Sequence, residues 1–262
     1  MKVYLLQFSP VWEDKEKNFE QVKKWIQSNK PSPNSLLVLP ETFATGFSLA
    51  LDKTLPGEPE QTESFLKNLS LEYGIWVMGG MITPALDSSN KGKNSVVLYS
   101  PDGTKSGTYE KIHLFNPSGE EKVHLPGNQV ESFEINGLKI CPLICYDLRF
   151  PEVFREGTKN GAEVFVVHAC WPIRRMNHWK VLLQARAIEN QAYVIGINRT
   201  GEEPETQYEG GSMVVDPQGN ILMELGNETI CQEVVLEKKL VDEWRASFPV
   251  PFRDPICRFL CP

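Results

Sequence analysis

The sequence has no long hydrophobic run, and no apolar segment approaches the roughly 18 residues that a membrane-spanning helix needs. It also has no excess of positive charge, because 27 Lys and Arg residues are outnumbered by 34 Asp and Glu residues, giving a net charge of −7. The basic residues are scattered and form no stripe. We therefore expect neither membrane insertion nor nucleic-acid binding.

Cysteine and histidine are also scarce. The six cysteines are spread over 262 residues, unlike the dense spacing of small disulfide-bonded secreted domains, so we expect free thiols. None of the four histidines has metal-ligand spacing: they are His113, His124, His168 and His178. Cys257 and Cys261 have a metal-like separation but no histidine beside them. We predict an enzyme or binding protein without metal or cofactor.

The segment Val3–Phe8 at the start of the chain is strand-like and lacks the basic start and long apolar core of a signal peptide. Together with the expected free thiols, this predicts a cytoplasmic location. No linker rich in serine or glycine divides the chain. We therefore expect a single domain over residues 1–262, with a C-terminal tail from about residue 253.

Strand-like and helix-like segments alternate along the chain. Apolar runs predict strands over Val3–Phe8, Leu36–Leu39, Ile75–Ile82, Ser95–Tyr99, Leu138–Ile144, Val164–His168, Val194–Ile197 and Met213–Val215. Amphipathic patterns predict helices over Lys15–Gln27, Glu60–Glu72, Pro151–Glu156 and Asn177–Asn190. Turn signals at Asp102-Gly103, Asn136-Gly137 and Gln218-Gly219 predict hairpins. The pattern indicates an α/β fold in which helices cover one face of a sheet and a second sheet covers the other.

Cys145 ends the apolar run Leu138–Ile144 and precedes a helix start at Pro151. A turn here would lift the sulfur out of the sheet and direct backbone N–H groups at a substrate oxygen. A nucleophilic thiol also needs a nearby base or cation, because few thiols are ionised at neutral pH. Cys145 is therefore a candidate nucleophile, and a buried structural cysteine is the alternative.

Glu41 and Lys111 are candidate partners for this thiol. Glu41 follows an apolar run, where burial would make its carboxylate a better proton acceptor. Lys111 lies at a polar-to-apolar transition, and its ammonium group would stabilise a developing oxyanion. The alternatives are a strand-end carboxylate that pairs locally and a surface lysine.

Two of the histidines differ in setting. His168 lies in an apolar strand and is most simply a hydrogen-bonded core residue. His178 lies beside Trp171 and Trp179, which favours a position in a pocket.

Three segments together resemble the nitrilase superfamily of carbon–nitrogen hydrolases: Leu37-Val38-Leu39-Pro40-Glu41, Tyr109-Glu110-Lys111-Ile112-His113-Leu114 and Leu143-Ile144-Cys145-Tyr146-Asp147-Leu148-Arg149-Phe150-Pro151-Glu152. The resemblance runs in order from residue 2 to about residue 253. It implies a four-layer α-β-β-α sandwich and assembly as a homodimer.

The resemblance also implies roles for individual residues. Glu41 would be the general base, Cys145 the nucleophile, and Lys111 would stabilise the tetrahedral intermediate with the backbone N–H of Tyr146. A second glutamate of the family precedes a glycine in the loop after the lysine, and counting back from Gly127 selects Glu120 over its neighbour Glu121.

Within the family the chain is most similar to ω-amidases, through the segments around Phe115, Trp171 and His178. Those enzymes hydrolyse the terminal amide of 2-oxoglutaramate or 2-oxosuccinamate. The alternatives are an N-carbamoyl-amine hydrolase, another amidase of the superfamily, or a non-catalytic binding protein on the same fold. We expect a small-molecule amide substrate.

A substrate with a free carboxylate needs a cation in the site. By chain position, Arg149 and His178 are the first candidates to bind it, and Arg174 and Arg175 are the next. Trp171 and Phe115 complete the predicted substrate-binding residues.

Overall fold

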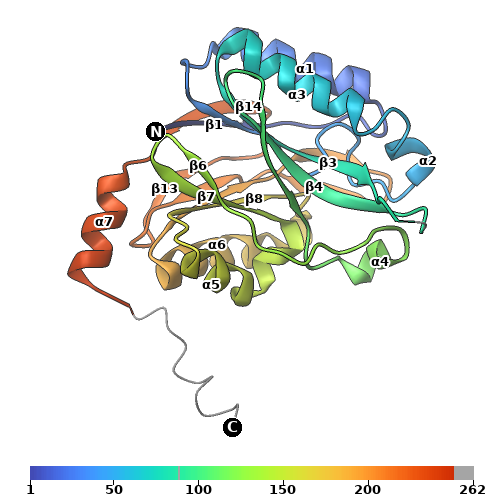
Figure 1. Cartoon of the computed structure of the whole chain (residues 1–262). Coiled ribbons are helices and arrows are strands. Elements are labelled where there is room, and N and C mark those ends of the chain that lie inside the picture. Colours follow the sequence, from blue (N-terminus) through green and yellow to red (C-terminus); the bar gives the residue numbers. More distant parts are fainter. Residues whose placement is uncertain (88, 251–262) are drawn as a thin grey trace.

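A computed structural model describes residues 1–87 and 89–250, and its core is a pair of stacked six-stranded sheets (Figure 1). The predicted C-terminal tail, with Cys257 and Cys261, lies outside the described residues. The chain order of the elements alternates strands with helices, as the sequence pattern predicts.

The first sheet combines a parallel centre with antiparallel flanks. Its strands follow the order β14 (Ile230–Val235), β1 (Lys2–Gln7), β2 (Leu36–Val38), β3 (Trp76–Pro84), β4 (Gly92–Tyr99) and β5 (Lys105–Glu110). Strands β1, β2 and β3 are parallel, whereas β14, β4 and β5 join antiparallel to their neighbours. Glu41 follows β2 and Lys111 follows β5, so one sheet supplies both candidate residues.

The second sheet repeats this arrangement. Its strands follow the order β13 (Ile221–Glu224), β12 (Met213–Val215), β9 (Tyr193–Ile197), β8 (Val164–His168), β7 (Leu138–Ile144) and β6 (Phe133–Ile135). Strands β7, β8 and β9 are parallel. Cys145 directly follows β7, so the thiol comes from the second sheet.

Alternation along the central strands explains why the sheets stack. Successive side chains of a strand point to opposite faces of its sheet. In β1, Val3 and Leu5 belong to the core between the two sheets, whereas Tyr4 and Leu6 belong to the core beneath the helices. Both faces of the strand are buried, which is why its sequence is an unbroken apolar run.

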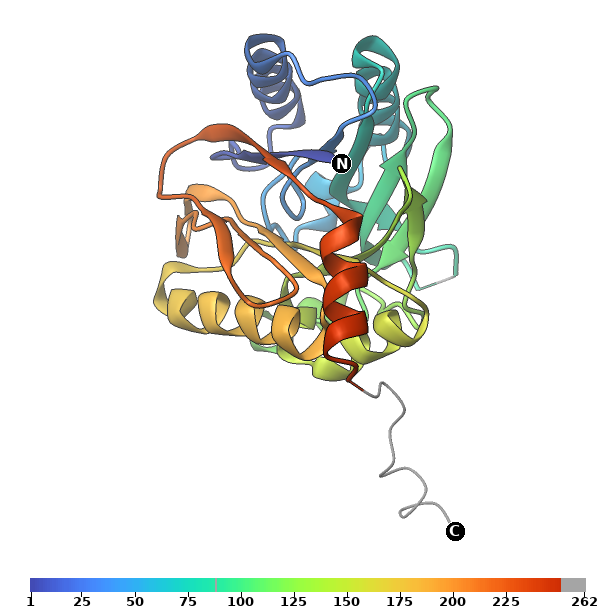
Figure 2. The same ribbon diagram turned by 90° about the vertical axis from the view of Figure 1, so that its left-hand side faces the viewer.

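Helices form the two outer layers (Figures 1 and 2). They are α1 (Lys15–Asn29) and α3 (Glu60–Tyr73) over the first sheet, and α5 (Pro151–Lys159) and α6 (Met176–Asn190) over the second. The four-layer α-β-β-α prediction is confirmed. None of the helices in residues 1–87 and 89–250 combines the length and apolar character of a membrane span.

Several elements were not predicted. They are the short helices α2 (Leu51–Thr54) and α4 (Glu120–Val123), helix α7 (Lys238–Ser247), strand β14, and the hairpin of β10 (Thr200–Glu203) and β11 (Thr206–Glu209). The hairpin predicted at Asn136-Gly137 is present, and both turn residues have the positive φ that such a turn requires.

Candidate active site

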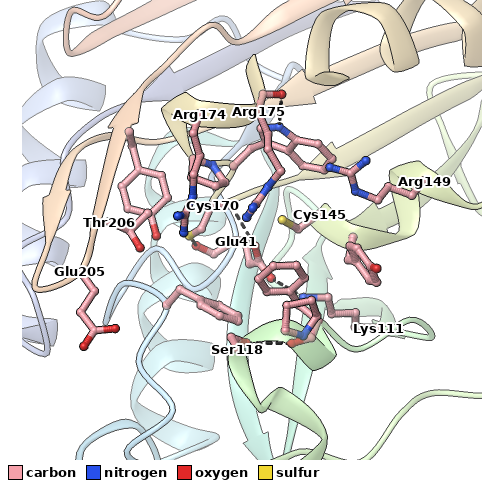
Figure 3. Close-up of a pocket in the computed structure, with 17 residues that line it drawn as sticks. Glu41, Lys111, Ser118, Cys145, Arg149, Cys170, Arg174, Arg175, Glu205 and Thr206 are labelled. Atoms are coloured by element: carbon pink, nitrogen blue, oxygen red, sulfur yellow. Dashed lines mark hydrogen bonds and ion pairs between the residues drawn. The ribbon is translucent and has the colours of Figure 1, made fainter. Parts of the chain in front are cut away.

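Glu41, Lys111 and Cys145 meet at one cavity of about 310 Å³ (Figure 3). Ligand-binding cavities are typically of this size or larger. Of the other predicted site residues, Tyr146, Arg149, Phe115 and Trp171 also line it. Three segments from two sheets therefore supply one site, as expected when reactive residues directly follow strands.

The Glu41 carboxylate is buried, with 1% of the residue exposed, and is held by three donors. Its Oε1 accepts hydrogen bonds from Lys111 Nζ at 2.9 Å and from Asn94 Nδ2 at 2.8 Å. Its Oε2 accepts one from the backbone N–H of Cys170 at 2.8 Å. A Cβ on Gly80 would lie 2.8 Å from the Glu41 Cα, so glycine at this position lets β3 approach the Glu41 backbone.

Lys111 lies between two carboxylates. Its Nζ is 2.9 Å from Glu41 Oε1 and 3.0 Å from Glu120 Oε2. Burial alone would lower the pKa of Lys111, but the charges of Glu41 and Glu120 outweigh it and raise the pKa above its ordinary value. The ammonium group is therefore fully charged and fixed in place.

Glu120 lies next to Lys111 and is not on the cavity wall. It also accepts hydrogen bonds from Asn94 Nδ2 at 3.1 Å and from the backbone N–H of Phe115 at 2.6 Å, and His124 Nδ1 lies 3.3 Å from it. Burial works to raise the pKa of Glu120, but Lys111 and these donors hold it well below the ordinary value. Glu120 is thus an ionised counter-charge beside the lysine.

Cys145 begins a 3-10 helix, Cys145–Arg149, at the end of β7, and its φ of 44° lies in the left-handed region. Non-glycine residues adopt this conformation at an energetic cost, and such strain is common at functional sites. The turn is held by Asp147, whose Oδ2 accepts hydrogen bonds from the Ile144 N–H at 3.0 Å and from Tyr109 at 2.7 Å. The expected sharp turn at the cysteine is present.

The surroundings of Cys145 favour the protonated thiol over the thiolate. Burial, followed by the charge of Glu41, raises its pKa well above the ordinary value, and Lys111 opposes this only in part. A nucleophilic role would thus require a base to accept the proton during attack. Among the described residues that line this cavity, Glu41 is the one buried carboxylate.

His178 does not line the cavity, contrary to the prediction of a pocket residue. It lies on the exposed side of α6, and its Nδ1 is 3.3 Å from Arg149 Nη2. The neighbouring Trp179 is turned into the core instead, with its Nε1 donating to the Gly211 carbonyl. His168 is a core residue as expected, with Nδ1 2.6 Å from the Leu39 carbonyl oxygen, and burial lowers its pKa to about 4.

The β10–β11 hairpin closes one side of the cavity. Glu205, Thr206 and Tyr208 from this hairpin line it. Glu203 holds the hairpin in place by pairing with Arg199 and by accepting a hydrogen bond from the Phe47 N–H at 2.8 Å. Sequence reasoning missed this wall, because the hairpin residues are mostly polar and show no strand pattern.

Asn94, Asp147 and Cys170 were also missed. Asn94 and the backbone of Cys170 hold Glu41, whereas Asp147 holds the turn at Cys145. The sequence held one signal for Asn94, which is its position as a polar residue directly before the predicted strand Ser95–Tyr99. Asp147 stands among the cysteine-motif residues, but only the fold shows that its carboxylate is fully buried.

Comparisons with known proteins identify the family of the chain. The sequence model for carbon-nitrogen hydrolases matches residues 2–246. The chain is 34% identical to the 2-oxoglutaramate amidase of Bacillus subtilis, with 94% of each chain covered. It is 35% identical to Omega-amidase YafV of Yersinia enterocolitica, covering 97% of this chain and 96% of that protein.

Solved structures show the same architecture. The protein XC1258 of Xanthomonas campestris, described as a CN-hydrolase superfamily protein with an arsenic adduct in its active site, superposes with a TM-score of 0.86. The two sequences are 29% identical, and 95% of each chain is covered.

Proposed function

Because the chain belongs to the carbon–nitrogen hydrolase family, we propose that it hydrolyses the terminal amide of a small 2-oxo acid amide. The substrate would be 2-oxoglutaramate or 2-oxosuccinamate, and the products the 2-oxo acid and ammonia. The observation that carries the proposal is the convergence of Glu41, Lys111 and Cys145 on one cavity. The names of the two amidase relatives support the choice of substrate.

The first half of the proposed reaction makes a thioester. Glu41 takes the proton of the Cys145 thiol, and the sulfur attacks the amide carbon. The tetrahedral intermediate collapses by breaking the carbon–nitrogen bond, and the proton held by Glu41 leaves with ammonia. The raised pKa of the resting thiol supports a base-assisted attack rather than a preformed thiolate.

The second half uses water. Glu41 takes a proton from a water molecule, which attacks the thioester carbon, and the sulfur of Cys145 leaves and regains a proton. The product is the free acid, and both side chains return to their starting state. No redox step occurs, and the proposed reaction needs only the amide and water.

Both tetrahedral intermediates carry an oxyanion, and we assign its stabilisation to the Lys111 ammonium and the backbone N–H of Tyr146. Loss of one such donor typically costs about 3 kcal/mol of transition-state stabilisation. Glu120 would act through Lys111, because its contact with the ammonium group fixes the position of the charge.

On the substrate side, Phe115 and Trp171 are proposed as apolar walls, and Arg149 as a source of positive charge facing the substrate. The guanidinium of Arg149 stacks on Trp171, with 4.8 Å between its Cζ and the ring centre. His178 would influence substrate only through its contact with Arg149.

We further propose that the domain spans the chain up to a tail at about residue 253. The protein would work as a homodimer in the cytoplasm, where thiols such as that of Cys145 stay reduced. Light scattering of the purified protein measures the assembly state, and a monomer would contradict the dimer.

The function is tested by ammonia release from a panel of amides. We expect 2-oxoglutaramate or 2-oxosuccinamate to give the highest kcat/KM, and N-carbamoyl amines and simple aliphatic amides to be poorer substrates. Preferential cleavage of an N-carbamoyl amine would contradict the substrate assignment and favour the alternative branch of the family.

A further inference from the structure

Three arginines on the cavity wall lack an acidic partner among the described residues. Arg149, Arg174 and Arg175 all line the cavity, and within residues 1–87 and 89–250 none of them pairs with a carboxylate. Arg186 and Arg199, by contrast, each pair with a glutamate. Arginines that are gathered without counter-charge destabilise one another, so an anion that enters the cavity would be bound favourably.

The charges near Cys145 are already paired. Lys111, which lines the cavity, pairs with Glu41 on the cavity wall and with Glu120 behind it. The three arginines line the same cavity, and among the described residues of its wall the carboxylate besides Glu41 is the exposed Glu205. An amide with a free carboxylate would therefore bind in one orientation, with the carboxylate among the arginines and the amide at Cys145.

Arg175 is better placed than its neighbours to contact that carboxylate. Its side chain extends into the cavity toward Cys145 and Glu41, whereas Arg149 lies on the other side of Cys145 (Figure 3). The Arg149 guanidinium is already engaged by Trp171 and His178. Arg174 is exposed, whereas Arg175 is half-buried.

Contacts with the cavity wall hold Arg175 in position. Its guanidinium lies 5.2 Å above the centre of the Phe115 ring, and its carbonyl accepts a hydrogen bond from Trp171 Nε1 at 2.8 Å. Burial and the neighbouring charges of Arg174 and Arg149 lower the pKa of Arg175. A bound anion would offset this repulsion between the arginines.

We propose that Arg175 binds the free carboxylate of the substrate directly, and that the three arginines of the cavity wall restrict the site to anionic amides without a nearby ammonium group. This inference rests on the proposed function and deepens it. Glutamine carries the same terminal amide as 2-oxoglutaramate but has an ammonium group beside its carboxylate, which the arginines would repel.

The test compares substrates that differ in charge. We expect Arg175→Leu to lower kcat/KM for 2-oxoglutaramate roughly 10- to 100-fold, mainly through KM, because a hydrogen-bonded charge pair is lost. The neutral substrate pentanamide should change less than threefold. Arg175→Lys should restore part of the loss, and Arg174→Leu, which removes the same charge from the neighbouring residue, should have a smaller effect.

A second readout does not depend on turnover of the proposed substrate. The readout is alkylation of Cys145 by iodoacetamide, followed by mass spectrometry. The dicarboxylate 2-oxoglutarate should slow this alkylation in the wild type and in the surface variant Lys180→Leu, but much less in Arg175→Leu. If the wild type fails to hydrolyse 2-oxoglutaramate yet this pattern holds, the proposed substrate is wrong and the Arg175 inference stands.

Two results would overturn the inference. One is that 2-oxoglutarate slows the alkylation of Cys145 equally in the wild type, in Arg175→Leu and in Arg175→Lys. The other is a large KM increase for 2-oxoglutaramate in Arg149→Leu together with an unchanged KM in Arg175→Leu.

Discussion

The ammonium group of Lys111 lies 3.0 Å from the carboxylate of Glu120, and at most 1% of either side chain is exposed. A buried ion pair of this kind contributes little to stability compared with an apolar pair of the same size. The ion pair instead fixes the position of Lys111. The ammonium group is held beside Glu41, at the cavity that Cys145 also lines. The family motif alone did not show this buried network.

Replacing Glu120 should affect catalysis more than replacing its neighbour. We expect Glu120→Gln to lower kcat roughly 10- to 100-fold, because Lys111 loses the partner that fixes it. The unfolding free energy should fall by about 3 kcal/mol, the usual cost of leaving a buried charge without one of its partners. The matched control is Glu121→Gln, which should change kcat less than twofold. Similar effects of the two variants would contradict the assignment of Glu120.

The same carboxylate makes stability depend on pH. The pKa of Glu120 is lowered in the folded protein by Lys111 and the surrounding donors, which outweigh its burial. A lowered carboxyl pKa stabilises the fold above the unfolded-state pKa, about 4.3 for glutamate, and this stabilisation is lost as pH falls through the folded-state pKa.

Denaturant titrations of wild type and Glu120→Gln should therefore differ by a constant free energy at neutral pH. The difference should shrink progressively below about pH 4.3. A difference that stays constant down to the pH of acid unfolding would show that the ionisation of Glu120 is not linked to folding.

Asp147 should control the turn that carries the cysteine. Its carboxylate accepts hydrogen bonds from the Ile144 N–H at 3.0 Å, the His113 N–H at 2.9 Å and Tyr109 Oη at 2.7 Å. In Asp147→Asn one acceptor becomes a donor, so we expect a loss of about 2 kcal/mol in unfolding free energy and a lower kcat. Tyr109→Phe removes a single bond and should cost about 1 kcal/mol. Equal stability of Asp147→Asn and wild type in denaturant titrations would refute this role.

Gly80 should be intolerant of even one added carbon. A Cβ at this position would meet the Glu41 Cα and the Thr42 N at 2.8 Å, and these backbone atoms can move only with the whole turn. Gly80→Ala should therefore destabilise the protein by roughly 1–3 kcal/mol and reduce kcat by displacing Glu41. At Gly226 the added carbon would meet the end of the flexible Glu228 side chain, so Gly226→Ala is the control and should remain active. Wild-type kcat in Gly80→Ala would exclude the proposed displacement.

The central strands and the helices over them were predictable because their sequence periods are strong. The helix predicted over Pro151–Glu156 runs on to Lys159, through Gly157. A Cβ at Gly157 would lie 2.7 Å from the ring of Phe165, so this glycine allows close packing and does not end the helix. Local sequence does not distinguish a glycine that ends a helix from one that allows close packing. The difference at Gly157 depends on Phe165, in a strand that follows later in the chain.

The candidate site was predictable to the extent that its residues follow strands. Residues that hold them, such as Asn94 and Asp147, are buried only because distant segments cover them. The error at His178 has a similar cause, since adjacent helix residues such as His178 and Trp179 face different directions, and local sequence does not show which direction each one faces. Which one faces the core is decided by how α6 packs on the second sheet.

The central claim is that Cys145 forms a thioester with the acyl part of the substrate. The most direct measurement is mass spectrometry of protein mixed with 2-oxoglutaramate and quenched in acid during turnover. The account predicts an acyl adduct on the peptide that contains Cys145, removed by hydroxylamine and absent in Cys145→Ala, which should be folded and inactive. Turnover by Cys145→Ala within tenfold of wild type, with no adduct in either protein, would contradict the mechanism.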